Sequence, residues 1–273
     1  MKTAVVTGAT SMLGITTVEE LLRQDVRVYA VVRPDSKKLD RLPASQNLSI
    51  VECSLSELPM IATRIPAPCD VFYHFGWEST EPYKRNTDFS AQCRNISGAV
   101  TAINLAKQLG CCTFIGAGSQ SEYGNLNIER ISPESPVRPI QPYAIAKYAA
   151  GRMCMEAAKQ LGIACIWVRV FSVYGHYDQP ETMVTSTIRK LNKGEPCYFT
   201  EAKQRWDYLN EADAGRAFYL IGEKCKESKV YCLGSGSARP LKEYIEIIRD
   251  CVAPSAVLHF GAIPYTSYSV MNI

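Results

Sequence analysis

The sequence lacks the features of several specialised protein classes. No apolar run approaches the roughly 18–20 residues that a membrane-spanning helix needs. Neither charge sign dominates: 30 Lys+Arg stand against 27 Asp+Glu, for a formal net charge of +3. This near-neutral balance argues against a nucleic-acid-binding or membrane-surface protein. With 47% hydrophobic and 21% charged residues among 273, we expect a soluble globular protein of one large or two unequal domains.

The eleven cysteines lack the pattern of a disulfide framework or a metal site. Their number is odd, they are scattered, and no two stand in a C-x-x-C pair. The only close pair is Cys111–Cys112, and adjacent cysteines rarely bridge. The spacing of zinc ligands is absent, so we predict no metal. We expect reduced, mostly buried thiols in a cytoplasmic protein.

Short β-branched runs alternate with helical stretches through the first two thirds of the chain. We predict strands at 3–7, 26–32, 48–53, 70–75, 113–117 and 164–170. Apolar periodicity predicts helices at 15–23, 89–109 and 143–161. Segment 132–142 holds four prolines and is predicted to be a loop. This order favours an α/β fold, a Rossmann-type doubly wound parallel sheet covered on both faces.

The loop after the first strand has the composition of a phosphate-binding turn. Thr3–Thr7 is followed by Gly8-Ala9-Thr10-Ser11-Met12-Leu13-Gly14 and then by a helix. Small residues let the backbone approach a pyrophosphate, and the N–H groups of the helix N-terminus point at the anion. We therefore predict dinucleotide binding at Gly8, Thr10, Ser11, Met12, Leu13 and Gly14. Ser11 stands where another glycine is usual.

The end of the second strand bears on the choice between NAD and NADP. An NAD site usually has an acidic residue there that accepts from the ribose 2′-OH. Asp25 precedes this strand and Asp35 follows the next proline, so neither is well placed. Arg33, with Lys37 or Lys38, suits a 2′-phosphate. NADP(H) is therefore favoured, and NAD(H) stays possible.

Tyr143 and Lys147 are spaced i, i+4 at the start of a predicted helix, so both project from one face. An ammonium beside a phenol favours the phenolate and lowers the tyrosine pKa from about 10. Tyrosine then serves as a general acid or base near neutral pH. Behind a phosphate loop and alternating strands, this pair predicts a dehydrogenase-type site.

At this point the chain resembles the extended short-chain dehydrogenase/reductases that act on nucleotide sugars. The resemblance covers nearly the whole chain and rests on several motifs together. Besides the phosphate loop and Tyr143-x-x-x-Lys147, these are His74-Phe75-Gly76, Asn95 in Asn-Ile-Ser-Gly, 118–124 (GSQSEYG), 169–175 (RVFSVYG) and 206–209 (WDYL) followed by Asp213.

The resemblance implies residue roles by position. Ser119 would hydrogen-bond the substrate oxygen, Tyr143 would exchange a proton with it, and Lys147 would also bind the nicotinamide ribose. Further cofactor contacts are implied at Ser54, Leu55, Phe75, Gly76 and Asn95. Substrate contacts are expected at Ser121, Ser172, Tyr174, Arg205 and Trp206, although many relatives have arginine where Trp206 stands.

Departures from the family pattern narrow the reaction. The 4,6-dehydratases carry Asp-Glu directly after the catalytic threonine, and here these positions are Gln120 and Ser121. Enzymes that epimerise C3 and C5 use a cysteine where Ser121 stands, with a histidine in a later loop, and His176 is out of register. Two reactions remain: reduction of a 4-keto (deoxy)sugar nucleotide by NADPH, and NAD-dependent 4-epimerisation. The absence of an acidic residue at the end of the second strand favours the reduction. A third alternative is a non-catalytic NAD(P)-sensing protein.

The later third of the sequence predicts a second, smaller lobe. Helices are expected at 182–191, 211–224 and 241–251. We expect 1–170 to form the NAD(P)-binding domain with 206–231 packing back on it, while 171–205 and 232–273 form the substrate-binding lobe. The resemblance implies a homodimer through a four-helix interface built from helices 89–109 and 143–161. Compared with the family, the chain is expected to be shortened at its C-terminus.

Overall fold

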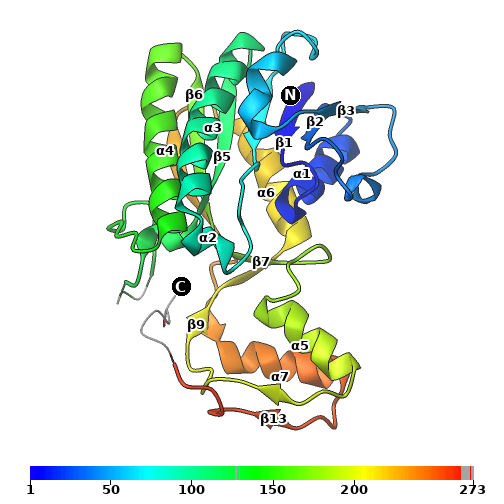
Figure 1. Ribbon diagram of the computed structural model, residues 1–273, viewed down its shortest axis with the longest axis vertical. Helices are drawn as coiled ribbons and strands as arrows, with labels where there is room; N and C mark the ends of the chain where they lie inside the picture. The colour runs from blue at the N-terminus through cyan, green and yellow to red at the C-terminus, as the bar shows by residue number, and fades with distance from the viewer. Residues whose placement is uncertain (127, 129, 266–270, 272–273) are drawn as a thin grey trace.

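The structure is a computed structural model that describes residues 1–126, 128, 130–265 and 271. Its main feature is a seven-stranded, wholly parallel sheet in the order β11-β6-β5-β4-β1-β2-β3 (Figure 1). The strands are β1 (Thr3–Thr7), β2 (Arg27–Val32), β3 (Leu48–Glu52), β4 (Val71–His74), β5 (Thr113–Ser119), β6 (Ala164–Val170) and β11 (Lys229–Leu233). The prediction of a Rossmann-type α/β fold is confirmed.

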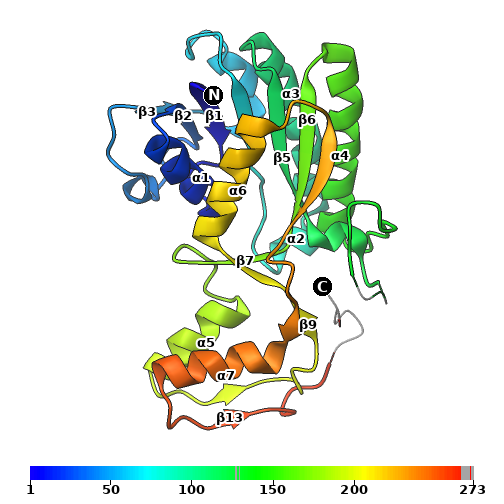
Figure 2. The same cartoon turned by 180° about the vertical axis from the view of Figure 1, so that it is seen from behind.

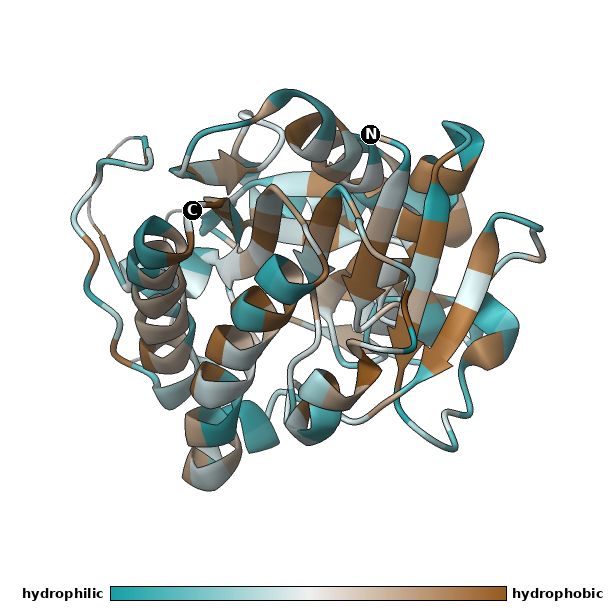
Figure 3. Cartoon of the chain, turned by 90° about the horizontal axis from the view of Figure 1, so that it is seen from above, coloured by the Kyte–Doolittle hydropathy of each residue, from teal (hydrophilic) through white to brown (hydrophobic). Residues whose placement is uncertain are grey.

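Helices cover both faces of the sheet, since successive strand residues point to opposite sides. Val5 packs with α3 (Phe89–Gln108) and α4 (Pro142–Leu161), whereas Val6 packs with α1 (Met12–Arg23) and α6 (Glu211–Lys224). Figure 3 shows the strands largely in the hydrophobic colour and the outer helices banded with hydrophilic residues. Burial on both faces explains why central strands such as β1 and β2 are nearly continuous apolar runs rather than alternating ones.

The remaining elements form a smaller layer beyond the carboxyl ends of the strands. It contains α5 (Met183–Asn192) and α7 (Leu241–Val252) (Figure 2). Short strand pairs accompany them: β7 (Ser172–Tyr174) with β10 (Tyr208–Asn210), β9 (Arg205–Trp206) with β12 (Arg239–Pro240), and β8 (Cys197–Tyr198) with β13 (Leu258–His259). The chain crosses back to the sheet through β10 and α6. This layer therefore faces the sheet edge where α/β proteins bind ligands.

Several boundaries differ by one to three residues from the sequence prediction, and three of these differences have a local explanation. The first helix begins at Met12 rather than at residue 15, because the Ser11 hydroxyl caps it by accepting from the Gly14 N–H at 3.1 Å. The proline-rich loop ends at Gln141, since Pro142 is the first residue of α4. Strand β5 runs on to Ser119, paired with β6 throughout its length.

Candidate active site

The phosphate loop has the tight geometry that its sequence predicts. Gly8 has a φ of +65°, and a Cβ there would lie 2.7 Å from the Gly76 N atom. A Cβ on Gly14 would collide with the Gly8 carbonyl oxygen. The two glycines thus let the loop pack closely, Gly8 against the end of β4 and Gly14 against the start of the loop, next to the start of α1. Ser11 is exposed beside it, with its hydroxyl used as the helix cap.

The end of β4 forms the neighbouring wall. The fully buried His74 ring lies 2.8 Å from the Thr7 hydroxyl, and burial, followed by the Lys147 charge, lowers the pKa of His74 to about 3. His74 is therefore neutral and structural. Phe75 packs edge-on against Phe218 at 4.8 Å, so its side chain belongs to the core. Leu55 packs directly against Gly76, at a place where a side chain on Gly76 would collide with it.

Asn95 is buried and has protein partners on both sides of its amide. Its oxygen accepts from the Glu78 N–H at 2.8 Å, and its nitrogen donates to the Glu78 carbonyl at 3.0 Å. The side chain therefore fixes the segment that follows β4. Ser54, another position with an implied cofactor contact, donates to the Glu57 carboxylate at 2.6 Å.

Ser119, Tyr143 and Lys147 come together at the carboxyl edge of the sheet. Ser119 ends β5 and caps the 3₁₀ helix η3 (Gln120–Tyr123), while Tyr143 and Lys147 lie in the first turns of α4. The Lys147 Nζ donates to the Ala117 carbonyl at 2.7 Å and lies 5.7 Å from the centre of the Tyr143 ring. Residues distant in sequence thus form one cluster.

The electrostatics of this cluster contradict the prediction that Lys147 lowers the pKa of Tyr143, because the pKa of Tyr143 is raised. Burial lowers the pKa of Lys147 to about 7, against the opposing effect of the Glu122 carboxylate. Burial raises the pKa of Tyr143, and the Arg85 guanidinium and the Ser119 side chain act in the opposite direction. The positive charge that lowers the Tyr143 pKa is therefore that of Arg85, in the short helix α2 (Lys84–Thr87), which sequence reasoning missed.

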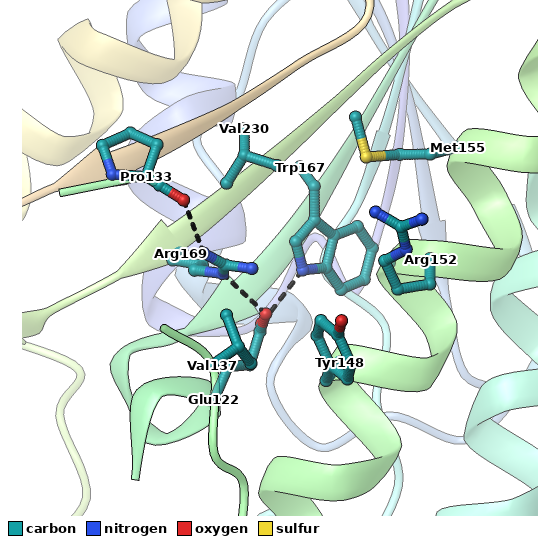
Figure 4. Close-up of a pocket in the computed structure, with 10 residues that line it drawn as sticks. Glu122, Pro133, Val137, Tyr148, Arg152, Met155, Trp167, Arg169 and Val230 are labelled. Atoms are coloured by element: carbon teal, nitrogen blue, oxygen red, sulfur yellow. Dashed lines mark hydrogen bonds and ion pairs between the residues drawn. The ribbon is translucent and has the colours of Figure 1, made fainter. Parts of the chain in front are cut away.

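Glu122 braces the strand end that carries Ser119, and Figure 4 shows its carboxylate hydrogen-bonded to Trp167 and Arg169. Its carboxylate is fully buried and accepts from the Ser119 N–H at 2.9 Å, from the Trp167 indole at 3.0 Å and from Arg169 at 2.8 Å. Arg169 also donates to the Tyr123 hydroxyl at 2.9 Å. The Glu122–Arg169 ion pair, which the sequence analysis also missed, lines a cavity of about 210 Å³ beside α4 and β6.

The candidate substrate residues divide into two groups. The Ser172 hydroxyl accepts from the Trp206 indole at 2.5 Å and from the Gln120 amide at 3.3 Å, which links the smaller layer to the loop after Ser119. Ser121 lies 3.2 Å from Ser119, hydroxyl to hydroxyl. Tyr174 instead packs edge-on against Tyr208, and the Arg205 guanidinium donates to the Ala238 carbonyl at 2.5 Å.

Basic side chains gather beyond the end of β2. Arg33 is exposed there, and the pKa of Lys38 is lowered by burial and then by the charges of Arg41 and Arg33, with Glu81 acting in the opposite direction. Arg41 also stacks over the Tyr177 ring at 4.7 Å. A bound anion would relieve the repulsion that Arg41 and Arg33 exert on the Lys38 ammonium.

Several expectations concern other kinds of site. Among the described residues, no group of three or more His, Cys, Asp or Glu side chains is arranged to hold a metal ion. Within the same part of the chain, no helix is long and apolar enough to cross a membrane. All eleven cysteines are free thiols, and six of them are buried.

Fold and site together define a Rossmann-fold oxidoreductase. Comparison with known proteins then identifies the family, because the model described as the NAD dependent epimerase/dehydratase family matches residues 4–234. The chain belongs to that family.

Individual relatives are distant but cover most of the chain. The dTDP-D-glucose 4,6-dehydratase of Mus musculus is 22% identical over 262 residues, which span 91% of this chain and 74% of the relative. The UDP-N-acetylglucosamine 4-epimerase of Methanobrevibacter ruminantium superposes with a TM-score of 0.88 at 18% identity, over 99% and 88% of the two chains. The dTDP-glucose 4,6-dehydratase of Streptomyces venezuelae, solved with NAD, gives 0.85 at 19% identity, over 99% and 87%.

Proposed function

We propose that the protein reduces the 4-keto group of a (deoxy)sugar nucleotide with NADPH. The observation that carries the proposal is the cluster of Ser119, Tyr143 and Lys147 at the carboxyl edge of the sheet, beside the phosphate loop. The side chains that follow Ser119 are Gln120 and Ser121, so the carboxylates that an elimination needs are missing at these positions.

The cluster supplies the groups that carbonyl reduction needs. The residues fit a dinucleotide, because the glycine-containing loop from Gly8 to Gly14 leads from β1 directly into the N-terminus of α1, whose backbone N–H groups suit a pyrophosphate. When bound, the reduced nicotinamide supplies the hydride. Tyr143 protonates the oxygen of the reduced carbonyl, and the Ser119 hydroxyl donates a hydrogen bond to the same oxygen. Lys147, with a pKa of about 7, replaces the proton that the phenol gives up.

The cofactor preference is proposed from the basic cluster after β2. The charges of Arg41 and Arg33 both disfavour the charge on Lys38, and a 2′-phosphate on the adenosine ribose would relieve that repulsion. Among the similar structures, the Streptomyces enzyme and Bordetella bronchiseptica WbmG were solved with NAD. Those enzymes share only the fold with this chain at such low identity.

Arg33→Ala is expected to weaken NADPH binding about tenfold to a hundredfold, since a charge-assisted hydrogen bond contributes roughly 1.5–3 kcal/mol. NADH binding should stay within about twofold, because NADH lacks the phosphate. Titration of the nucleotide-free protein, followed by nicotinamide fluorescence, measures both. Arg23→Ala, on the exposed end of α1, is the control. Equal affinity of the unaltered protein for NADPH and NADH would refute this preference.

The reductase itself is tested by supplying NADPH and nucleotide-bound 4-keto-6-deoxyhexoses. We expect one NADPH to be consumed for each hydroxyl formed. Oxidation of NADPH that is independent of the sugar, or none with any member of the panel, would contradict the proposal.

The second candidate is an NAD-dependent 4-epimerase, which the similarity to the Methanobrevibacter UDP-N-acetylglucosamine 4-epimerase favours. The same three residues would serve, with Tyr143 acting first as base and then as acid. An epimerase converts a nucleotide hexose into its C4 epimer without net consumption of cofactor. Epimer formation by protein that retains NAD throughout would place this candidate first.

We also propose a homodimer, assembled in the cytoplasm as the free thiols favour, through the outer faces of α3 and α4. These helices pack side by side (Figure 1) and carry the exposed apolar side chains Phe89, Ile145 and Met153. We expect light scattering at micromolar concentration to give twice the mass of 30.3 kDa. Ile145→Asp combined with Met153→Asp should give monomers, because each buried charge would lack a partner. A monomeric unaltered protein would refute this interface.

The smaller layer is proposed to hold the nucleotide part of the substrate, with Ser172 and Trp206 nearest to the segment that follows Ser119. Ser121, Tyr174 and Arg205 complete the set of proposed substrate contacts. Residues 171–205 and 232–273 would thus act as the substrate-binding lobe, and 1–170 with 206–231 as the cofactor-binding domain.

A further inference from the structure

A tryptophan lies against two of the three proposed catalytic side chains. Trp77 follows Gly76 at the end of β4, and the Lys147 Nζ sits 3.7 Å from the centre of its indole ring. The same indole meets the Tyr143 ring edge-on, at 6.2 Å between centroids and 80° between planes. Lys147 is only 5% exposed, so the indole covers an ammonium that has little contact with water.

The Trp77 indole is held in this position by a buried polar network. Its N–H donates to the Gln92 side-chain oxygen on α3 at 3.0 Å, and Gln92 is 3% exposed. The same oxygen lies 3.4 Å from the amide nitrogen of Asn95, which also brackets the Glu78 peptide through two hydrogen bonds. Backbone and side chain are thus both fixed, so the ring is presented to Lys147 in a defined orientation.

An ammonium has three donors, and the described residues give Lys147 one acceptor, the Ala117 carbonyl. The electron-rich face of an indole attracts a cation, most strongly where water is excluded. Glu122 from η3 acts on the Lys147 charge, and this charge in turn helps to lower the pKa of His74 on β4. Tyr143 on the same helix completes this environment. The indole therefore supplies a face that the other elements do not.

We propose that Trp77 is a positioning residue of the catalytic site, which holds the Lys147 ammonium between its indole face and the Ala117 carbonyl, beside the Tyr143 phenol. The inference rests on the proposed roles of Tyr143 and Lys147. It assigns to the residue after the His74-Phe75-Gly76 segment a function that the sequence analysis did not. A phenylalanine preserves an aromatic face at this place, whereas an alanine removes it.

Two measurements test the proposal on Trp77→Ala and Trp77→Phe. In Trp77→Ala, reductive methylation of Lys147, followed by peptide mass spectrometry, should accelerate severalfold relative to the exposed Lys159. The kcat should fall about 10- to 30-fold, as expected for a desolvated cation–π contact, with little change in KM. Trp77→Phe should keep Lys147 protected and restore most of kcat. Tyr83→Ala, an exposed aromatic of the same loop, should change neither quantity.

A second variant guards against misfolding of Trp77→Ala. Gln92→Leu removes the acceptor that orients the indole but keeps the indole itself, and it should produce the same changes in smaller measure. Unchanged labelling of Lys147 in Trp77→Ala would overturn the proposal. So would a rise in KM without a fall in kcat, since that result indicates a substrate contact. The labelling of Lys147 needs no substrate, so it tests the Trp77–Lys147 contact whether or not the protein shows turnover. Absence of turnover in the unaltered protein would refute the proposed function alone.

Discussion

Tyr143→Phe is expected to reduce kcat about a thousandfold, within the range that general acid–base groups contribute. The substitution removes only the hydroxyl that protonates the substrate oxygen, and it leaves the ring contacts with Trp77 and Lys147 in place. Steady-state rates with the nucleotide sugar and cofactor give the effect, and nicotinamide fluorescence verifies that the cofactor still binds.

Tyr148→Phe is the matched control, because Tyr148 lies on the same helix but lines the cavity next to Glu122 and Arg169. Its kcat should stay within about twofold of the unaltered protein. A Tyr143→Phe protein with full turnover would contradict the assigned role. If the unaltered protein shows no turnover and the Tyr143→Phe variant keeps its biological activity, the protein is instead a cofactor sensor.

Glu122→Gln should lower the free energy of unfolding by about 3–5 kcal/mol, the cost of breaking a buried ion pair. Glu122 is fully buried, and its partner Arg169 would keep its charge without a carboxylate. The new amide also carries two donors where Ser119 N–H, Trp167 and Arg169 need acceptors. Urea denaturation, followed by circular dichroism, gives the change.

Glu156→Gln provides the comparison, because this exposed α4 residue pairs with Lys159 at 2.8 Å at the surface. Surface pairs contribute little, so the change should stay below about 1 kcal/mol. Equal losses in the two variants would show that the Glu122 network does not brace the strand end. Loss of turnover in Glu122→Gln under conditions where it stays folded would further link this network to Ser119.

The sheet could be predicted where a run of apolar, β-branched residues is bounded by turn-forming residues. The predicted bounds of β1, β6 and α6 coincide with those observed, and at two of these elements the boundary residue is clear: β1 is followed by Gly8, and α6 is capped by Asn210. Strand β11 was missed, since Lys229–Leu233 is short, lies at the sheet edge and is only partly buried. Gly118 and Ser119 were also left out of β5, and pairing with β6 overrides their weak strand preference.

The candidate site was predictable only as far as local spacing reaches. Tyr143 and Lys147 lie one helical turn apart, so the sequence itself places them on one face. Trp77, Arg85 and Glu122 contact this cluster from other elements, and no local pattern specifies such contacts. Glu122 shows one local signal, a capping box with Ser119, but its ion pair with Arg169 depends on the pairing of β5 with β6.

Transfer of label from NADPH deuterated at C4 of the nicotinamide tests the central claim most directly. The protein, a nucleotide-bound 4-keto sugar and the reductant labelled on each face in turn would be incubated, and the product analysed by NMR. We predict one deuterium on the sugar carbon that gains the hydroxyl, delivered from one face only and lost in Tyr143→Phe. A protein that binds NADPH and the sugar nucleotide but leaves the sugar carbon unlabelled would contradict the account.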